Sequence, residues 1–202
     1  GKPDEALAAY NRALAIFERL AEANPDVTEF QSRLAASHHN IGVLLSETGK
    51  PDEALAAYKQ ALAIFERLAR EHPESPEFAS NLGGTLNSIA LIELVAKRYD
   101  RARDLLREAV TRQKKAMAAN PSNPDYRRFL KYHLTSLNDV AQGLGDDALA
   151  AEAAHGLAEL EASDPRLKAL DERLAAVRRG EAPRDNLERL ALAQRAYDTK
   201  QF

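Results

Sequence analysis

The chain of 202 residues contains no cysteine, and valine, threonine and glycine are scarce. Without cysteine there is no disulfide bond, no thiolate nucleophile and no zinc–sulfur site, and such a composition suits a reducing compartment. Alanine, leucine, glutamate and arginine dominate instead. Because these side chains lose little rotamer freedom in a helix, the composition predicts helix throughout and essentially no β-sheet.

Long apolar runs and a basic excess are absent as well. No apolar stretch approaches the roughly 20 residues that a membrane-spanning helix needs, and the first residues do not read as a signal peptide. The formal net charge is −3 and the isoelectric point is about 6.0, so there is no overall basic field to neutralise phosphates. We therefore expect a cytoplasmic protein with neither a membrane nor a nucleic acid as partner.

Motifs for catalysis and metal binding are also missing. The sequence has no glycine-rich phosphate loop, no HRD-like or DFG segment, and no spacing that pairs a nucleophile with a base. His38 and His39 are adjacent, so on a helix they point about 100° apart, and no His-x3-His pattern completes a metal site. His133 and His155 have no evident partner. We expect no enzyme, no metal and no cofactor.

What the sequence does contain is a repeat. The segment GKPDEALAAY fills residues 1–10 and again 49–58, and ALAIFERLA at residues 13–21 returns at 61–69, each 48 residues later. A third, diverged copy keeps the register, as four alanines at the same spacing show: Ala6, Ala54, Ala102 and Ala150. Periods of this length indicate stacked units that bury their apolar sides only against one another, which favours a binding surface over a catalytic pocket.

Periodicity within one repeat predicts two helices. Apolar residues in Pro51–Glu71 fall three and four apart and form one stripe. Pro51 suits the first turn of a helix, and Pro73 cannot continue one. A second stripe covers residues 29–47, so the two helices form an antiparallel hairpin around the turn at residues 48–50.

The same pattern, shifted by whole periods, gives the remaining helices. We expect them near residues 76–96, 99–119, 125–144 and 146–162. The array then spans residues 1–164, as a half repeat (1–25) and full repeats at about 26–73, 74–121 and 122–164. The register breaks after that. Residues 165–202 are expected to hold an irregular spacer helix near 166–178 and, over 190–202, the first helix of a truncated further repeat.

These residues resemble the tetratricopeptide repeat, a helix–turn–helix family with recurring Leu-Gly, Tyr and Ala-x3-aromatic signatures. Gly42 follows an isoleucine in place of Leu-Gly, and Gly49 is the turn glycine. The signature of the second helix recurs in three copies, at Ala6, Tyr10 and Ala13, at Ala54, Tyr58 and Ala61, and at Ala102, Leu106 and Ala109. The resemblance implies an all-α solenoid of antiparallel helix hairpins wound into a right-handed superhelix.

The period departs from the usual 34 residues of that family by roughly 14, or about two helical turns for each helix. We therefore expect elongated helices. Such long repeats resemble those of kinesin light chains. Their amino-acid sequence is also similar to bacterial repeat arrays that often follow a serine/threonine protein kinase domain. This implies a fragment of a bacterial signalling protein, which opens at a turn glycine, Gly1, and closes on an unpaired first helix.

In this family, ligands lie in the concave groove lined by the first helices. Carried onto this sequence, the resemblance places these residues there: Arg33, His39, Val43, Ser46, Asn87, Leu91, Leu94, Arg128, Tyr132, Thr135 and Asp139. His39 and Asn87 could bond a peptide backbone while Leu91 and Tyr132 accept side chains. The alternative is that these are only the solvated residues that any helix shows. Paired lysines and asparagines of a carboxylate clamp are not evident.

Other charged and irregular positions have plainer explanations. The stretches at residues 98–107 and 112–115 are expected to be a solvated outer face with ion pairs four residues apart rather than a nucleic-acid patch. Asn138 takes a place that calls for a small residue, and with Gly143 it suggests that the third hairpin packs differently.

Two functions remain open. The first is a protein-interaction module that holds a peptide or protein segment in the concave groove. The second is a structural spacer, or a segment that self-associates end to end. The second would draw on Leu187, Leu190 and Leu192 or Tyr197, which are expected to lack a covering helix and to swap or pack in a non-native way.

Overall fold

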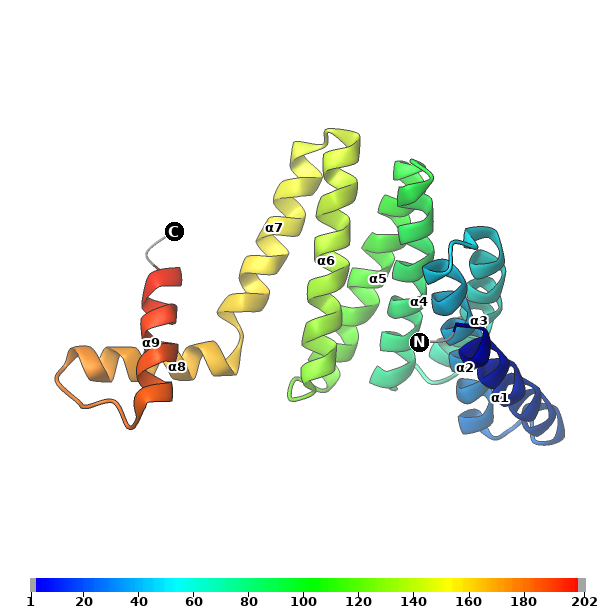
Figure 1. The fold of residues 1–202 in the computed structure, drawn as a ribbon, viewed down its shortest axis with the longest axis horizontal. Coiled ribbons are helices and arrows are strands. Elements are labelled where there is room, and N and C mark those ends of the chain that lie inside the picture. Colours follow the sequence, from blue (N-terminus) through cyan, green and yellow to red (C-terminus); the bar gives the residue numbers. More distant parts are fainter. Residues whose placement is uncertain (1–2, 200–202) are drawn as a thin grey trace. The chain divides into compact units, whose positions relative to one another are not determined.

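The computed structural model describes residues 3–199, and the regular structure of this range is entirely helical. Its helices, shown in Figure 1, are α1 (Pro3–Ala23), α2 (Thr28–Glu47), α3 (Pro51–Glu71), α4 (Pro76–Val95), α5 (Tyr99–Ala119), α6 (Pro124–Leu144), α7 (Asp147–Ala162), α8 (Pro165–Arg178) and α9 (Asn186–Asp198). The predicted all-α fold is confirmed, and α3 and α5 have the predicted bounds. Gly1 and the end of the predicted segment 190–202 lie outside the described residues.

The chain divides into two compact units, residues 1–154 and residues 155–202. The first holds α1 to α6 and the first half of α7, and the second holds the rest of α7 with α8 and α9.

Several helices begin where the sequence places a polar residue before a proline. The side chains of Ser75, Asn123 and Asp164 each accept a hydrogen bond from a backbone N–H in the first turn of α4, α6 and α8. Proline follows each of them, and in the first turn its missing N–H costs no helical hydrogen bond. These are local signals, which is why the starts of the helices were predictable.

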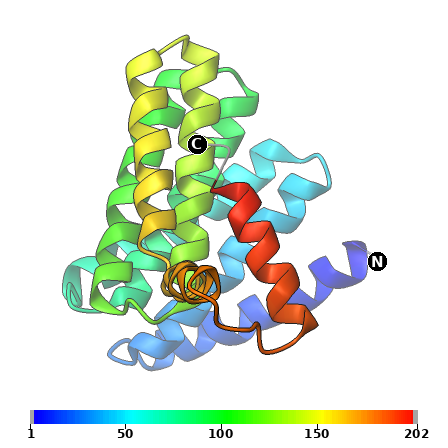
Figure 2. The same ribbon diagram turned by 90° about the vertical axis from the view of Figure 1, so that its left-hand side faces the viewer.

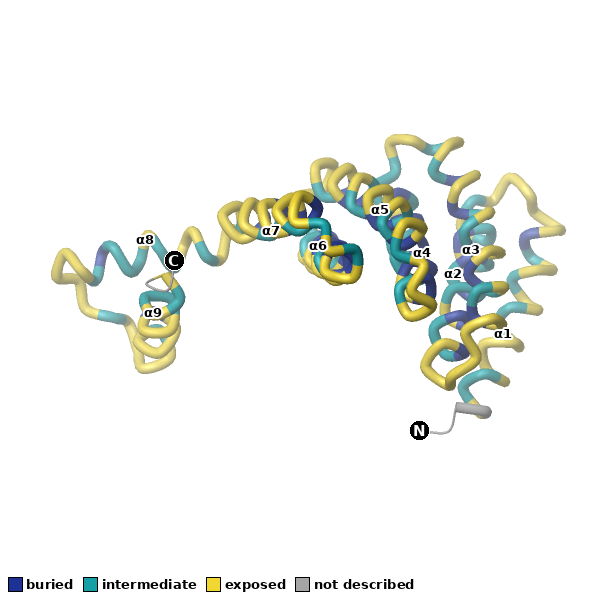
Figure 3. Tube along the Cα trace, turned by 90° about the horizontal axis from the view of Figure 1, so that it is seen from above, coloured by how far each residue is buried: buried dark blue, intermediate teal, exposed yellow. Residues whose placement is uncertain are grey.

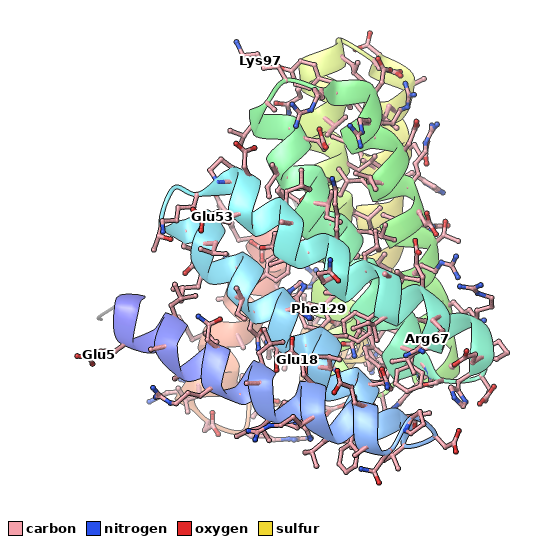
Figure 4. The ribbon with its side chains drawn as sticks, turned by 90° about the vertical axis from the view of Figure 1, so that its right-hand side faces the viewer. Glu5, Glu18, Glu53, Arg67, Lys97 and Phe129 are labelled. Atoms are coloured by element: carbon pink, nitrogen blue, oxygen red, sulfur yellow. The ribbon has the colours of Figure 1, made fainter. Side chains whose placement is uncertain are left out.

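The turns inside the hairpins share one backbone conformation. Gly49 and Gly145 have positive φ angles of 77° and 64°, and Lys97, which lies 48 residues from each, has a φ of 58°. A residue with a Cβ adopts this left-handed region only at a cost. The Lys97 side chain extends from its turn into solvent (Figure 4), so no tertiary packing explains the lysine there.

In the first unit each helix from α1 to α6 packs against the next, and the first helices α2, α4 and α6 also contact one another in succession. Figure 3 shows that the buried positions of α2 to α6 lie between neighbouring helices. The helix α4 contacts α2, α3, α5 and α6, and it has the most buried residues of any described helix. The core therefore runs continuously along the stack, as expected for a repeat array.

Large and small residues are exchanged between equivalent positions of the hairpins. A Cβ on Gly42 would lie 2.6 Å from the ring of Tyr58, so only glycine leaves room for this tyrosine. One period later Ala90 and Leu106 belong to the same buried cluster. Asn138 holds the corresponding place in the third hairpin, where an alanine takes the position of the tyrosine. From the first hairpin to the third, the side chain on the first helix becomes larger while the one opposite it on the second helix becomes smaller.

Gly143 has a separate reason. A Cβ there would collide with the ring of Tyr99, so the glycine admits a tyrosine from α5. Glu47 and Val95 hold the equivalent positions in the earlier hairpins, and this contact has no counterpart there.

A buried polar chain ties three helices together. Ser80 Oγ donates to Gln113 Oε1 at 3.0 Å, and Gln113 Nε2 donates to the carbonyl of Tyr126 at 3.0 Å. Gln113 is fully buried, and Phe65 takes its place one period earlier. Because the buried side-chain oxygen and nitrogen of the glutamine are both hydrogen-bonded, their hydrogen bonds to water are replaced, and the residue links α4, α5 and α6.

A buried acid marks the end of α4. Glu93 is 1% exposed and lies where the preceding repeat has the core residue Leu45. Its carboxylate accepts a hydrogen bond from Arg98 Nε and lies 3.8 Å from Arg101 Nη1. The two cations compensate a charge that would otherwise be very costly to bury.

The second unit depends more on ion pairs than on an apolar core. Figure 2 shows α9 beside α8, which is seen there along its axis. Arg173 bonds Glu188 at 2.8 Å and Glu181 at 2.6 Å. Arg195 Nη2 lies 2.8 Å from Asp171, and this guanidinium holds the pKa of the Asp171 carboxyl below its usual range. The guanidinium side chains of Arg173 and Arg195 are only 19% and 13% exposed, so these partly covered pairs are screened less by solvent than fully exposed ones.

Two expectations for this unit need correction. Leu192 was expected to lack cover but is only 4% exposed, whereas Leu187, Leu190 and Tyr197 are indeed largely exposed. His155 does have a partner, since its Nε2 lies 3.3 Å from a carboxylate oxygen of Glu159 one helical turn away.

Candidate partner-binding face

The first helices of the hairpins each leave one stripe uncovered. On α4, the exposed and half-buried residues at intervals of three and four are Glu77, Asn81, Gly84, Ser88, Leu91 and Val95. One period earlier, on α2, the equivalent positions are Glu29, Arg33, Ala36, Asn40, Val43 and Glu47. On α6 the exposed stripe is Asp125, Arg128, Tyr132, Thr135, Asp139 and Gln142. We call these three stripes together the first-helix face.

This face lies on the inside of the curve of the first unit. The helix α4 contacts both α2 and α6, whereas no such contact joins α3 to α5 in the described part of the chain. Because the first helices approach one another more closely than the second helices do, the two layers bend toward the first-helix side.

The predicted groove residues divide into two groups. Those exposed on or beside the first-helix face are Arg33, Ser46, Leu91, Arg128, Tyr132, Thr135 and Asp139. Those partly or largely covered are His39, Val43, Asn87 and Leu94. Leu94 packs against the buried cluster of α4 to α7, and Val43 packs against the cluster of α2, α3 and α4.

His39 belongs to the seam between α2 and α4. Its Nδ1 lies 3.2 Å from Thr85 Oγ1, and its ring centroid lies 5.3 Å from that of Tyr58. The Thr85 hydroxyl donates to the carbonyl of Asn81 at 2.9 Å, so it accepts from Nδ1, and the proton of the neutral ring is on Nδ1. Burial lowers the pKa of His39 to about 4, so the ring is neutral at physiological pH.

The next seam, between α4 and α6, holds the equivalent pair in an unbonded form. Asn87 and His133 lie one period after His39 and Thr85. The Oδ1 atom of Asn87 and both ring nitrogens of His133 are buried, and none has a hydrogen-bond partner among the described residues. Burial also lowers the pKa of His133 to about 4. The acceptor of Asn87 is therefore enclosed in the seam rather than presented to a ligand.

Apolar side chains gather on the exposed part of the face. Leu91 is 41% exposed, Val95 84% and Tyr132 57%, although the packing beneath them is tight. Beside them Gly84 leaves open space, since a Cβ built there would meet no atom within 4 Å. These groups could accept apolar side chains of a partner.

The two arginines predicted to extend the wall are already engaged within their own helices. Arg33 Nε lies 2.7 Å from Glu29, and Arg128 Nη2 lies 2.9 Å from Asp125. The Arg128 guanidinium also lies 5.1 Å from the ring centroid of Phe129. Both guanidinium groups are therefore already paired with carboxylates of their own helices.

Sequence reasoning missed a cleft of about 330 Å³ on the other layer, between α3 and α5, with α4 as its floor. Leu55, Leu62, Ile89 and Leu105 form its apolar lining, and its charged lining residues are Lys59, Glu93, Arg101, Asp104 and Glu108. One period later Arg107 of α5 and Glu152 of α7 form an ion pair of 2.7 Å at the positions of Lys59 and Asp104. A basic and an acidic residue hold these positions in both repeats, so no signal in the sequence distinguished the cleft.

Neither a metal-binding cluster nor a membrane-spanning helix is found among the described residues. No group of three or more His, Asp or Glu side chains in residues 3–199 could hold a metal ion. Within the same range, no helix combines the length and the apolar character needed to cross a bilayer.

Comparison with known proteins decides the family. A sequence model described as tetratricopeptide repeat matches residues 1–67, and a second model with the same description matches residues 82–125. Together these segments cover more than half of the chain. The chain belongs to the tetratricopeptide-repeat family. As such it is an interaction or scaffold module in general terms, of a fold that is generally not catalytic.

A solved structure supports the same fold. The crystal structure of BtubC (BKLC) from P. vanneervenii superposes with a TM-score of 0.52 at 15% sequence identity. The match covers 89% of this chain and 61% of that one, so this chain spans less than two thirds of its length. No curated protein matches the sequence.

Proposed function

We propose that the first-helix face of this tetratricopeptide array binds an extended peptide or a segment of a partner protein. The observation that carries the proposal is the exposure of Leu91, Val95 and Tyr132 on α4 and α6, above a closely packed core. Exposed apolar groups grouped on one face of a repeat array are typical of a protein-binding surface. The exposed Thr135 and Asp139 beside them supply polar contacts for a peptide backbone.

The test is selection from a random peptide library on three forms of the protein. The first is the wild type, the second carries Leu91→Glu and Tyr132→Glu, and the third carries Lys59→Glu and Asp104→Lys at the cleft between α3 and α5. All four positions are exposed, so the fold should survive, which circular dichroism can check.

We expect enriched peptides that bind the wild type and the cleft variant but not the face variant. Peptides lost only on the cleft variant would move the site to the second-helix layer. No enrichment on any form would refute peptide binding by this segment.

A structural role is the second candidate, and the exposed residues of α9 favour it. Leu187, Leu190 and Tyr197 are 79%, 70% and 61% exposed, and a second copy of the chain could cover them. Sedimentation equilibrium should then show association that Leu187→Ser with Leu190→Ser abolishes. A protein that stays monomeric at high concentration would count against this role.

The setting of the protein is a proposal of the same kind. The repeat sequences are similar to those of bacterial arrays that follow a serine/threonine kinase domain. This similarity supports a cytoplasmic signalling protein of bacterial origin. The reading frame around the segment checks it directly.

A further inference from the structure

At the C-terminal ends of α2, α4 and α6, the first-helix face combines exposed apolar side chains with acidic residues that form no ion pair with any described residue. Val43 on α2 and Leu91 on α4 occupy the same place in successive repeats, and Val95 lies one turn beyond Leu91. The equivalent of Val95 on α2 is Glu47, and the equivalent of Leu91 on α6 is Asp139. A central apolar group on α4 is thus flanked by one carboxylate from each neighbouring first helix.

Both carboxylates are exposed, and neither forms an ion pair within the described part of the chain. The parallel helices α2, α4 and α6 also end at this edge, where each helix dipole adds partial negative charge. Of the basic residues in the neighbouring turns, Lys50 pairs with Glu53 and Arg98 with Glu93. Lys97 extends from its turn into solvent (Figure 4). The charge of Lys97 opposes the field of this edge, but the two carboxylates and the three helix ends outweigh it, so the edge attracts a cation.

We infer that this end of the face recognises an extended segment in which an aliphatic residue stands between two basic residues, in the order basic-x-aliphatic-x-basic. The inference rests on the proposed function and adds the chemistry of the partner. Packed helices lie about 8–10 Å apart, so Glu47 and Asp139, two helices apart, are separated by about 16–20 Å.

That span fixes the spacing of the partner's residues. In an extended chain the residues i, i+2 and i+4 point to one side, and i and i+4 are about 13 Å apart. Lysine or arginine side chains at both ends can bridge the rest, while the middle side chain covers Leu91 and Val95. Acidic or phosphorylated segments would be repelled.

The test uses two labelled synthetic peptides, Gly-Lys-Ser-Leu-Ser-Lys-Gly and Gly-Glu-Ser-Leu-Ser-Glu-Gly, and fluorescence anisotropy. The proteins are the wild type, Glu47→Gln with Asp139→Asn, and Leu91→Ser with Val95→Ser. The matched control is Glu22→Gln with Glu66→Gln, which removes two exposed carboxylates from α1 and α3.

The lysine peptide should bind the wild type and the control equally, and the glutamate peptide should bind neither. An exposed ion pair changes a dissociation constant by about 1.4- to 5-fold, so loss of both acids should weaken binding by about 3- to 10-fold at low salt. At about 0.5 M salt this difference should shrink because the charges are screened. Loss of Leu91 and Val95 should weaken binding at both salt concentrations.

Several results would overturn the inference. They are equal binding of the two peptides, unchanged binding after Glu47 and Asp139 are neutralised, and no binding of the lysine peptide to the wild type. Library peptides that depend on the face but lack basic residues would also overturn it, and the proposed function would then still stand. If the library gave no such peptides, the proposed function would fail independently.

Discussion

Lys97 is the residue whose replacement should most simply stabilise this protein. It has a φ of 58° at the turn between α4 and α5, where the other two hairpins have Gly49 and Gly145. Lys97 is exposed and forms no ion pair within residues 3–199, so Lys97→Gly removes no contact. We therefore expect Lys97→Gly to raise the free energy of unfolding.

The magnitude follows from two opposing effects. A residue with a Cβ pays about 1–2 kcal/mol in the left-handed region. Glycine loses more backbone freedom on folding, which costs about 0.5–1 kcal/mol. The net gain should be about 0.5–1 kcal/mol, or a rise in Tm of about 1–4 °C for a chain of this size. The reverse change, Gly49→Ala, should lose a similar amount.

Urea unfolding followed by circular dichroism measures these differences. Lys97→Ala is the matched control, because it removes the lysine side chain but keeps the Cβ, and it should leave stability within about 0.5 kcal/mol. If Lys97→Gly were no more stable than Lys97→Ala, the argument from backbone strain would be wrong.

Two further predictions concern buried ionisable groups. Burial lowers the pKa of His39 and His133 to about 4. Between about pH 6.5 and 4 the unfolded chain therefore binds more protons than the folded one, and the free energy of unfolding decreases as the pH is lowered. At pH 5 each histidine should lower the free energy of unfolding by about 2 kcal/mol. In the double variant His39→Gln with His133→Gln, the decrease in this free energy between pH 7.5 and pH 5 should therefore be smaller than in the wild type. An equal decrease in both proteins would contradict the prediction. Arg98→Ala should destabilise by about 1–3 kcal/mol because it leaves the Glu93 carboxylate underpaired, whereas Glu93→Leu should cost less. Thermal unfolding of both variants gives the order, and the opposite order would refute the argument.

The helices were predictable because their signals lie within a few residues. The stripe in Pro51–Glu71, the proline in its first turn and the glycine in the preceding turn all act locally. The period of 48 residues then placed the helices of the diverged hairpins. Even the turn at Lys97 was placed correctly, although a lysine gives no sign of a positive φ.

The candidate site was predicted less completely. The family resemblance offered Leu91 and Tyr132 as groove residues, and both side chains are exposed, but it offered His39 and Asn87 in the same way, and these are largely covered. Whether a residue beside a stripe is exposed depends on how closely the neighbouring first helix approaches. That distance depends on side chains from other repeats.

The sequence by itself determined that the chain is a helical array, where its helices begin and end, and which residues share a helix face, because hydrogen bonding within a helix involves near neighbours only. Tertiary structure alone decided that Glu93 is buried and paired with Arg98, that Gly143 admits Tyr99, and that a cleft opens between α3 and α5. Those outcomes depend on contacts between helices, where burial, volume and charge must be satisfied together.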